Sequence, residues 1–161
     1  EKYIHDMSDD QLVDALLGWR LRRDYLKQLA PLIRQRIKKL DKFIPATDFF
    51  FAGDLDYSAV FDQLVIPEVA PADVAKGLLA FVERFEAREA WSHEMLHDEA
   101  KAWTDELGWK SKHSFILLRL VATGRKASPG LFETMAVLGK EVLRRRVRRA
   151  AELIASGGKA K

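Results

Sequence analysis

Apolar residues recur at helical spacing along almost the whole chain, and no stretch alternates in the way that a half-buried strand requires. The first helix is the clearest, because Ser8-Asp9-Asp10-Gln11 forms a capping box ahead of Leu12 and Leu16. This helix is predicted to end near Trp19. Further helices are predicted over residues 24–40, with an interruption at Pro31, and over 45–51, 58–64, 72–89, 92–107, 112–123, 129–138 and 140–155. The pattern therefore predicts an all-α fold.

The stretch over residues 115–139 predicts a corner between two helices. Gly124 follows an apolar helical stripe and suits the left-handed residue just past a helix end. Ser128 suits an N-cap with Pro129 at the first helical position, so the next helix is expected to begin there. The loop between them is basic, and the amides at a helix start can bind phosphates or base edges.

Two prolines bracket residues 66–71, which makes this segment the best candidate for a linker. We therefore expect two small helical bundles in series, over residues 1–68 and 69–155. The segment over 156–161 is rich in small and polar residues and is expected to be a disordered tail.

Composition sets modest bounds. With 161 residues and 48% hydrophobic content, the chain can bury a real core. It has no cysteine, which excludes a disulfide framework and favours the cytoplasm. There is no signal-peptide pattern and no apolar run of membrane-spanning length. The sequence begins at Glu1 rather than at methionine, so we expect a piece of a longer chain.

Charge is strongly segregated along the sequence. Lysine and arginine outnumber aspartate and glutamate by ten to seven over residues 1–47 and by thirteen to three over 107–161, but are outnumbered by fourteen to four over 48–106. The last helix carries a run of cations around an apolar stripe: Lys140, Arg144, Arg145, Arg146, Arg148 and Arg149. This run indicates either a polyanion partner or a solvated helix face, and both interpretations stay open.

One motif favours chemistry. His93-Glu94-Met95-Leu96-His97 matches the H-E-x-x-H zinc signature on a predicted helix. A zinc hydrolase needs a third protein ligand, and the extended form fails because its later histidine is replaced by Trp103. Glu106 and His113 are conceivable ligands, although neither stands at a diagnostic spacing. We therefore predict no metal site and keep a zinc-dependent hydrolase acting through His93, Glu94 and His97 as an alternative.

Three blocks occur in order near the end of the chain: RLVATG over residues 119–124, SPGLFE over 128–133 and LGKE over 138–141. Together they closely resemble the C-terminal signature of bacterial glutamyl-tRNA synthetases, R-x-A-L-T-G, S/T-P-x-L-F/Y-E and L-G-K-E. Upstream, PLIRQRIKKL over 31–40 and DFFF over 48–51 look like the R-x-K-T-L helix and the aromatic element of that family. The similarity spans residues 1 to about 154. Val121-Ala122 and Lys39 depart from the usual family residues but keep the helices.

The resemblance implies binding of tRNA(Glu) by two helical subdomains that read the inner stem and the anticodon loop. Arg36 matches the arginine that reads the third anticodon base, cytosine, in glutamate-discriminating members. Arg119, Ser128, Pro129 and Leu131 match the positions that hold the first two anticodon bases.

The residues favour the reading role of Arg36 independently. On a continuous helix Arg36 would lie about 60° from the stripe of Ile33, Ile37 and Leu40, with its guanidinium free to meet a base edge. An ordinary surface cation is the alternative. Supporting basic contacts to the nucleic acid are expected from Lys39, Arg125, Lys126, Arg144, Arg145 and Arg148.

The family's H-I-G-H and lysine-loop motifs belong to its nucleotide-binding fold, and this sequence has neither. We therefore expect no catalytic residue and no cofactor in this chain, with ATP and Mg²⁺ serving the full-length enzyme. The expected partners are tRNA(Glu) and the catalytic domain of the same polypeptide. A cytoplasmic monomer without membrane contact is expected. A free-standing tRNA-binding module is the alternative.

Overall fold

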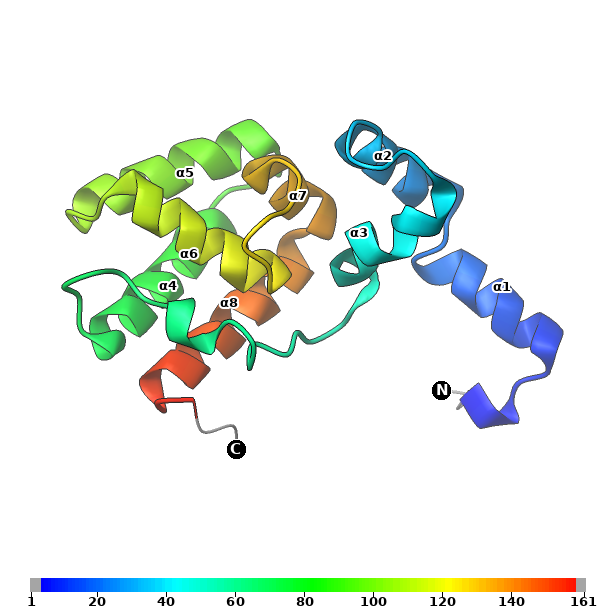
Figure 1. The fold of residues 1–161 in the computed structure, drawn as a ribbon, viewed down its shortest axis with the longest axis horizontal. Coiled ribbons are helices and arrows are strands. Elements are labelled where there is room, and N and C mark those ends of the chain that lie inside the picture. Colours follow the sequence, from blue (N-terminus) through cyan, green and yellow to red (C-terminus); the bar gives the residue numbers. More distant parts are fainter. Residues whose placement is uncertain (1–3, 159–161) are drawn as a thin grey trace. The chain divides into compact units, whose positions relative to one another are not determined.

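The structure, a computed structural model, describes residues 4–158. Within these residues it contains eight α-helices, three short 3-10 helices and no strand, which confirms the all-α prediction (Figure 1). The α-helices are α1 (Asp9–Trp19), α2 (Arg23–Ile33), α3 (Phe43–Phe51), α4 (Pro71–Glu86), α5 (His93–Glu106), α6 (Ser111–Thr123), α7 (Leu131–Leu138) and α8 (Lys140–Ala155).

The chain divides into two compact units, Glu1–Ala46 and Thr47–Lys161. The boundary that the sequence suggested near residue 68 thus falls inside the second unit. The reason is that Tyr57, Leu64 and Ile66, in the segment ahead of the two prolines, are buried. Because buried side chains tie a segment to its surroundings, residues 57–66, which lead up to the predicted linker at 66–71, are part of the second unit's fold.

The first unit contains α1 and α2. The predicted capping box is confirmed, since the Gln11 amide donates to Ser8 Oγ (3.3 Å) and the Ser8 amide donates to Gln11 Oε1 (3.2 Å). The interruption predicted at Pro31 is wrong, since α2 continues through this residue. Pro31 lies inside α2, two positions before its last residue, and has no amide to donate to the carbonyl four residues earlier. The helix ends at Ile33 rather than at Leu40.

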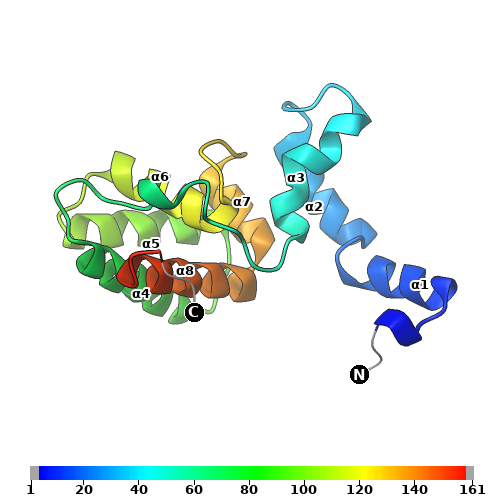
Figure 2. The ribbon, with the colours of Figure 1, turned by 60° about the horizontal axis from the view of Figure 1, so that its bottom comes forward.

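The second unit is built around α4 and α8, which pack along each other, as both ribbon views show (Figures 1 and 2). Its core is rich in aromatic side chains: the Trp103 ring lies 5.2 Å from Phe81 and 5.2 Å from Trp109, centroid to centroid. Trp103 Nε1 donates to the Gly77 carbonyl (2.7 Å), so even this large buried side chain has its polar atom satisfied.

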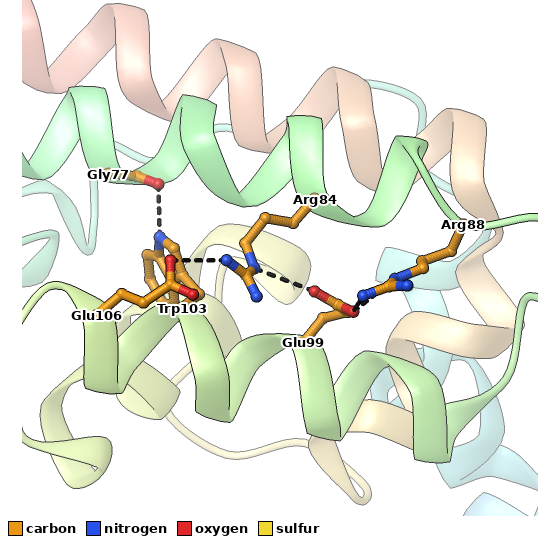
Figure 3. Close-up of polar contacts among 6 residues, drawn as sticks. All are labelled: Gly77, Arg84, Arg88, Glu99, Trp103 and Glu106. Atoms are coloured by element: carbon orange, nitrogen blue, oxygen red, sulfur yellow. Dashed lines mark hydrogen bonds and ion pairs between the residues drawn. The ribbon is translucent and has the colours of Figure 1, made fainter.

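Polar contacts fix α5 on α4 (Figure 3). Glu99 is buried and accepts from Arg84 Nε (3.0 Å) and from Arg88 Nε (2.6 Å). Arg84 Nη1 also donates to Glu106 (2.7 Å). Removing either arginine is expected to destabilise the unit, because part of the charge of the buried carboxylate is then left uncompensated.

The connection between α3 and α4 differs from the prediction. A helix over residues 58–64 was expected, but the structure has only the 3-10 helix Phe61–Gln63 there. The segment is held instead by Tyr57, whose hydroxyl donates to the Val121 carbonyl (2.7 Å). Burial raises the pKa of this hydroxyl well above its usual range.

At the other end, α8 is closed by a turn in which the Gly157 and Gly158 amides donate to Ile154 and Leu153 carbonyls. The part of the expected disordered tail over 156–158 is therefore a hydrogen-bonded turn, and residues 159–161 lie outside the described residues. None of the helices within 4–158 has the length and apolarity needed to cross a membrane.

Candidate nucleic-acid interface

The corner between α6 and α7 is the first part of the candidate site. The helix α6 ends at Thr123, and Gly124 adopts the left-handed conformation (φ 67°), as the sequence predicted. A six-residue loop follows, over 125–130, and α7 begins at Leu131. The turn thus sets the direction in which the loop leaves the helix.

The prediction that Ser128 caps α7 is wrong. The N-cap residue is Gly130, and Ser128 is only 6% exposed because it faces Arg119 instead of the helix. Arg119 Nη1 donates to Ser128 Oγ, to the Pro129 carbonyl (2.9 Å) and to the Ser128 carbonyl (3.3 Å). Pro129 and Leu131 are buried as well. The structure therefore brings together all four residues that were matched to the first two anticodon bases, with Arg119 holding the loop in shape.

Thr123 closes the same network from the helix side. Its hydroxyl donates to the Arg119 carbonyl (2.7 Å) and accepts from the Arg125 amide (3.1 Å). The main chain of Arg119 is thereby coupled to the start of the loop, while its side chain is bonded to the end of the loop. The corner is consequently a preorganised element, and Lys126 stands exposed on it.

Arg125 connects the loop to the DFFF element. Its guanidinium forms an ion pair with Asp48 and lies 5.4 Å from the centroid of the Phe49 ring. These partners are 77 positions apart in the sequence, so periodicity and spacing could not reveal the pairing. The loop and the DFFF element therefore belong to one surface of the second unit.

Arg146 underlies this surface, although the sequence analysis grouped it with the other cations of the last helix, for which a polyanion partner and a solvated face were both left open. It is 1% exposed. Its guanidinium donates to the carbonyls of Ala122 (2.6 Å), Phe49 (2.6 Å) and Ala52 (2.9 Å). These carbonyls lie at the C-terminal ends of α6 and α3, where a positive charge is favoured by the helix dipoles. Arg146 thus positions the DFFF element against the end of α6.

The remaining arginines of α8 are balanced by carboxylates. Arg144 pairs with Glu86 (2.8 Å) and Glu141, and Arg145 pairs with Asp54 (2.9 Å). An open hollow of about 480 Å³ is lined by Asp54, Glu141, Arg144, Arg145, Arg148, Arg149 and Glu152. A polyanion that binds in this hollow has to displace the carboxylates from the arginines, because the arginines already form ion pairs with them.

Arg36 and Lys39 belong to the first unit. Arg36 lies in the turn after α2, where its amide donates to the Ile33 carbonyl (2.8 Å), and its side chain is exposed. The helical stripe from which its orientation was predicted does not form, since Leu40 is 89% exposed. Lys39 is also exposed, directly before the 3-10 helix Leu40–Lys42. Arg36 is therefore exposed because it lies in a turn, and not because it lies beside the apolar stripe of a continuous helix.

The H-E-x-x-H residues lie at the start of α5. His93 Nδ1 lies 2.9 Å from Glu94, His97 Nδ1 lies 3.1 Å from Asp98, and the His97 ring packs edge-on against Phe132. The pKa of Glu94 is lowered by its own backbone amide and by Ser92. Within residues 4–158 no three histidines or acids are grouped so that they could hold a metal ion. His93 thus contacts its neighbouring carboxylate, and His97 contacts its neighbouring carboxylate and packs against Phe132.

Comparison with known proteins identifies close similarities. The family model described as "Anticodon binding domain" matches residues 10–151. A glutamate–tRNA ligase of Roseiflexus castenholzii is 36% identical, over 96% of this chain and 32% of its own length. Those of Acidothermus cellulolyticus and Alcanivorax borkumensis are 32% and 30% identical, over 97% and 95% of this chain. The chain spans about a third of the length of these relatives.

Proposed function

Because this chain belongs to the anticodon-binding domain family of glutamate–tRNA ligases, we propose that it binds the anticodon stem-loop of tRNA(Glu). Residues of both compact units contribute to recognition. The observation that carries the proposal is the preorganised corner at residues 119–131, which lies inside the matched region. Anticodon bases are single-stranded and unstacked, so a rigid protein surface can meet their Watson–Crick edges.

At the corner, the first two anticodon bases contact the surface formed by Arg119, Ser128, Pro129 and Leu131. The three loop residues are buried, so they act mainly through the shape and backbone of the loop. Arg119 stabilises that shape through its bonds to the loop carbonyls. Base readout through a fixed backbone is favourable because little conformational entropy is lost on binding.

Arg36 reads the third anticodon base. Its exposed guanidinium in the turn after α2 can donate two parallel hydrogen bonds to a base edge, which lysine or glutamine cannot reproduce. Recognition of cytosine at this position distinguishes the tRNA for glutamate from that for glutamine. Lys39, three residues later, contacts the neighbouring phosphate.

Phosphate contacts elsewhere come from Arg125 and Lys126 on the loop and from Arg144, Arg145 and Arg148 on α8. These contacts fix the register of the stem-loop and carry no sequence information. The surrounding carboxylates reduce the net positive charge of the α8 hollow.

The chemistry belongs to the remainder of the ligase. In the full-length cytoplasmic enzyme, a catalytic domain with ATP and Mg²⁺ joins glutamate to tRNA, and anticodon binding by this region positions the acceptor end. The isolated chain is a monomer that has no membrane contact and no ligase activity of its own.

The experiment that tests the proposal measures binding of the chain to anticodon stem-loops of tRNA(Glu) and tRNA(Gln). We expect the glutamate stem-loop to bind more tightly, and Arg36→Gln to reduce the preference by about 1–3 kcal/mol. Arg34→Gln, an exposed arginine in the same turn, is the matched control and should leave the preference unchanged. An unaltered preference in Arg36→Gln would remove Arg36 from the reading role.

Salt dependence tests the phosphate contacts separately. With about six cations contacting phosphates, affinity should fall about 1,000-fold between about 50 and 200 mM salt. Equal affinity at both salt concentrations would contradict the proposed basic contacts, and no binding at either would contradict the proposed function.

A further inference from the structure

The helix α1 presents apolar side chains that nothing in its own unit covers. No side chain of α1 is buried, and α1 does not pack extensively on α2. Val13 is 53% exposed, Leu17 52% and Trp19 57%. Leu16 and Leu21 are exposed as well. An apolar face of this kind usually marks an interaction surface.

The length of α1 strengthens this interpretation. It has 11 residues, and isolated helices shorter than about 12–15 residues are marginal in water, because most helical stability in proteins comes from packing of an apolar face. The Ser8 capping box contributes only about 1 kcal/mol. A stable α1 therefore requires a surface that covers its exposed leucines and valine.

A groove beside α1 shows what chemistry that surface has. The groove has a volume of about 550 Å³ and is formed by the end of α1, the turn that follows it and residues 23–30 of α2. Its apolar lining comes from Leu17, Leu21, Leu26 and Ala30. Its polar lining is cationic throughout: Arg22, Arg23 and Lys27. An amphipathic segment with apolar residues in the centre and carboxylates at the edge is complementary to it.

We propose that the face of α1 and this groove are covered by a segment of the ligase polypeptide outside this chain, apolar in the centre and acidic at its edge. The inference rests on the proposed function. About two thirds of the length of each relative lies outside the match, so such polypeptide is present in full-length members of the family. RNA is a poorer occupant, because aliphatic side chains such as Val13 and Leu17 provide no platform for base stacking and no phosphate contact.

The test compares amide hydrogen exchange over residues 9–30 in the chain alone and in the full-length polypeptide, both without tRNA. We expect α1 amides to exchange about tenfold more slowly, or slower still, in the full-length polypeptide. Leu17→Asp should abolish this slowing. Leu40→Asp is the matched control, because Leu40 is equally apolar, highly exposed and outside the groove.

Leu17→Asp removes little packing within the unit, since Leu17 is 52% exposed. Hydrogen exchange over α1 in the isolated Leu17→Asp chain should therefore stay close to that of the unaltered isolated chain. Equal α1 exchange in the two polypeptides would overturn the proposal. Slow exchange of the α1 amides in the isolated chain would also overturn it. This holds if the protection is independent of protein concentration, and also if the protection increases with concentration because a second copy binds. Because no tRNA is added, failure of this test leaves anticodon binding untouched, and failure of anticodon binding leaves this test valid.

Discussion

The two units follow the same local rules and differ in what stabilises them. Both begin a helix with a serine cap, Ser8 at α1 and Ser92 at α5. In the second unit the capped helix then buries Leu96 and Trp103 and is fixed by a buried carboxylate, Glu99. In the first unit the capped helix buries nothing. Local sequence signals thus start helices in both units. An extensive buried core that stabilises those helices is present only in the second unit.

Replacing the buried Arg146 should have the largest effect on the stability of the second unit relative to the first. Arg146→Leu removes the donor from three carbonyls, and each buried acceptor left unpaired costs about 1–3 kcal/mol, so we expect the second unit to lose about 4 kcal/mol. Urea unfolding followed by circular dichroism measures the loss. The exposed neighbour Arg145 is the control, since Arg145→Leu removes one surface ion pair worth less than about 1 kcal/mol. Similar losses in both variants would mean that Arg146 does not stabilise the unit through these carbonyls.

Core truncation should separate the two units. Leu29 in α2 and Leu78 in α4 are both fully buried, and a buried leucine truncated to alanine costs about 2–5 kcal/mol. We expect Leu29→Ala to unfold the first unit while hydrogen exchange in α4 and α8 stays unchanged. Leu78→Ala should destabilise the second unit only. A single shared loss of protection in both variants would show that the two units unfold together.

The two serine caps offer a smaller, matched pair. Ser8→Ala and Ser92→Ala each remove an acceptor for a helix amide, and each costs about 1 kcal/mol. For Ser92 the cost should appear as a lower midpoint of global unfolding. For Ser8 it should appear only as faster hydrogen exchange over α1. A lower global midpoint in Ser8→Ala would mean that α1 is coupled to the main core.

The smallest effect concerns alkaline pH. Burial raises the pKa of Tyr57, so its folded-state pKa exceeds its unfolded value. The contribution of Tyr57 is therefore complete below about pH 10, the ordinary tyrosine pKa, and is lost as pH rises above it. Melting temperatures measured between about pH 9 and pH 11 should fall less steeply in Tyr57→Phe than in the unaltered chain. Identical slopes would mean that Tyr57 ionises in the folded state as easily as in the unfolded chain.

Much of the helical fold could be predicted because its signals are local. The capping box at Ser8, the left-handed Gly124 and the ends of α6 and α8 depend on residues within a few positions of one another. Where the prediction was wrong, a tertiary contact decided. Ser128 has every property of an N-cap, yet its hydroxyl bonds Arg119 and the helix starts at Leu131. Residues 58–64 are apolar enough for a helix but are held in place by the Tyr57 bond to Val121.

The candidate site could be predicted as a set of residues but not as an arrangement. Family blocks located Arg119, Ser128 and Pro129, and the structure shows them bonded together. The helical period places Arg146 beside the apolar stripe of α8 and Arg145 on the opposite face. The sequence could not show that Arg146 is buried and bonded, because the carbonyls that it contacts come from segments over 20 and over 90 positions away.

The distribution of tryptophan gives the two units separate spectroscopic reporters. Trp19 is the first unit's tryptophan and is largely in water, whereas Trp103 in the second unit is enclosed by Phe81, Trp109 and the Gly77 carbonyl. Emission from an enclosed indole lies at shorter wavelength than emission from a hydrated one. Trp91 and Trp109 of the second unit are only partly exposed, so quenching by iodide in solution should report mainly on α1. The short-wavelength edge of the spectrum should report on the α4–α5 interior. Covering of α1 by other polypeptide can thus be followed without attaching a label.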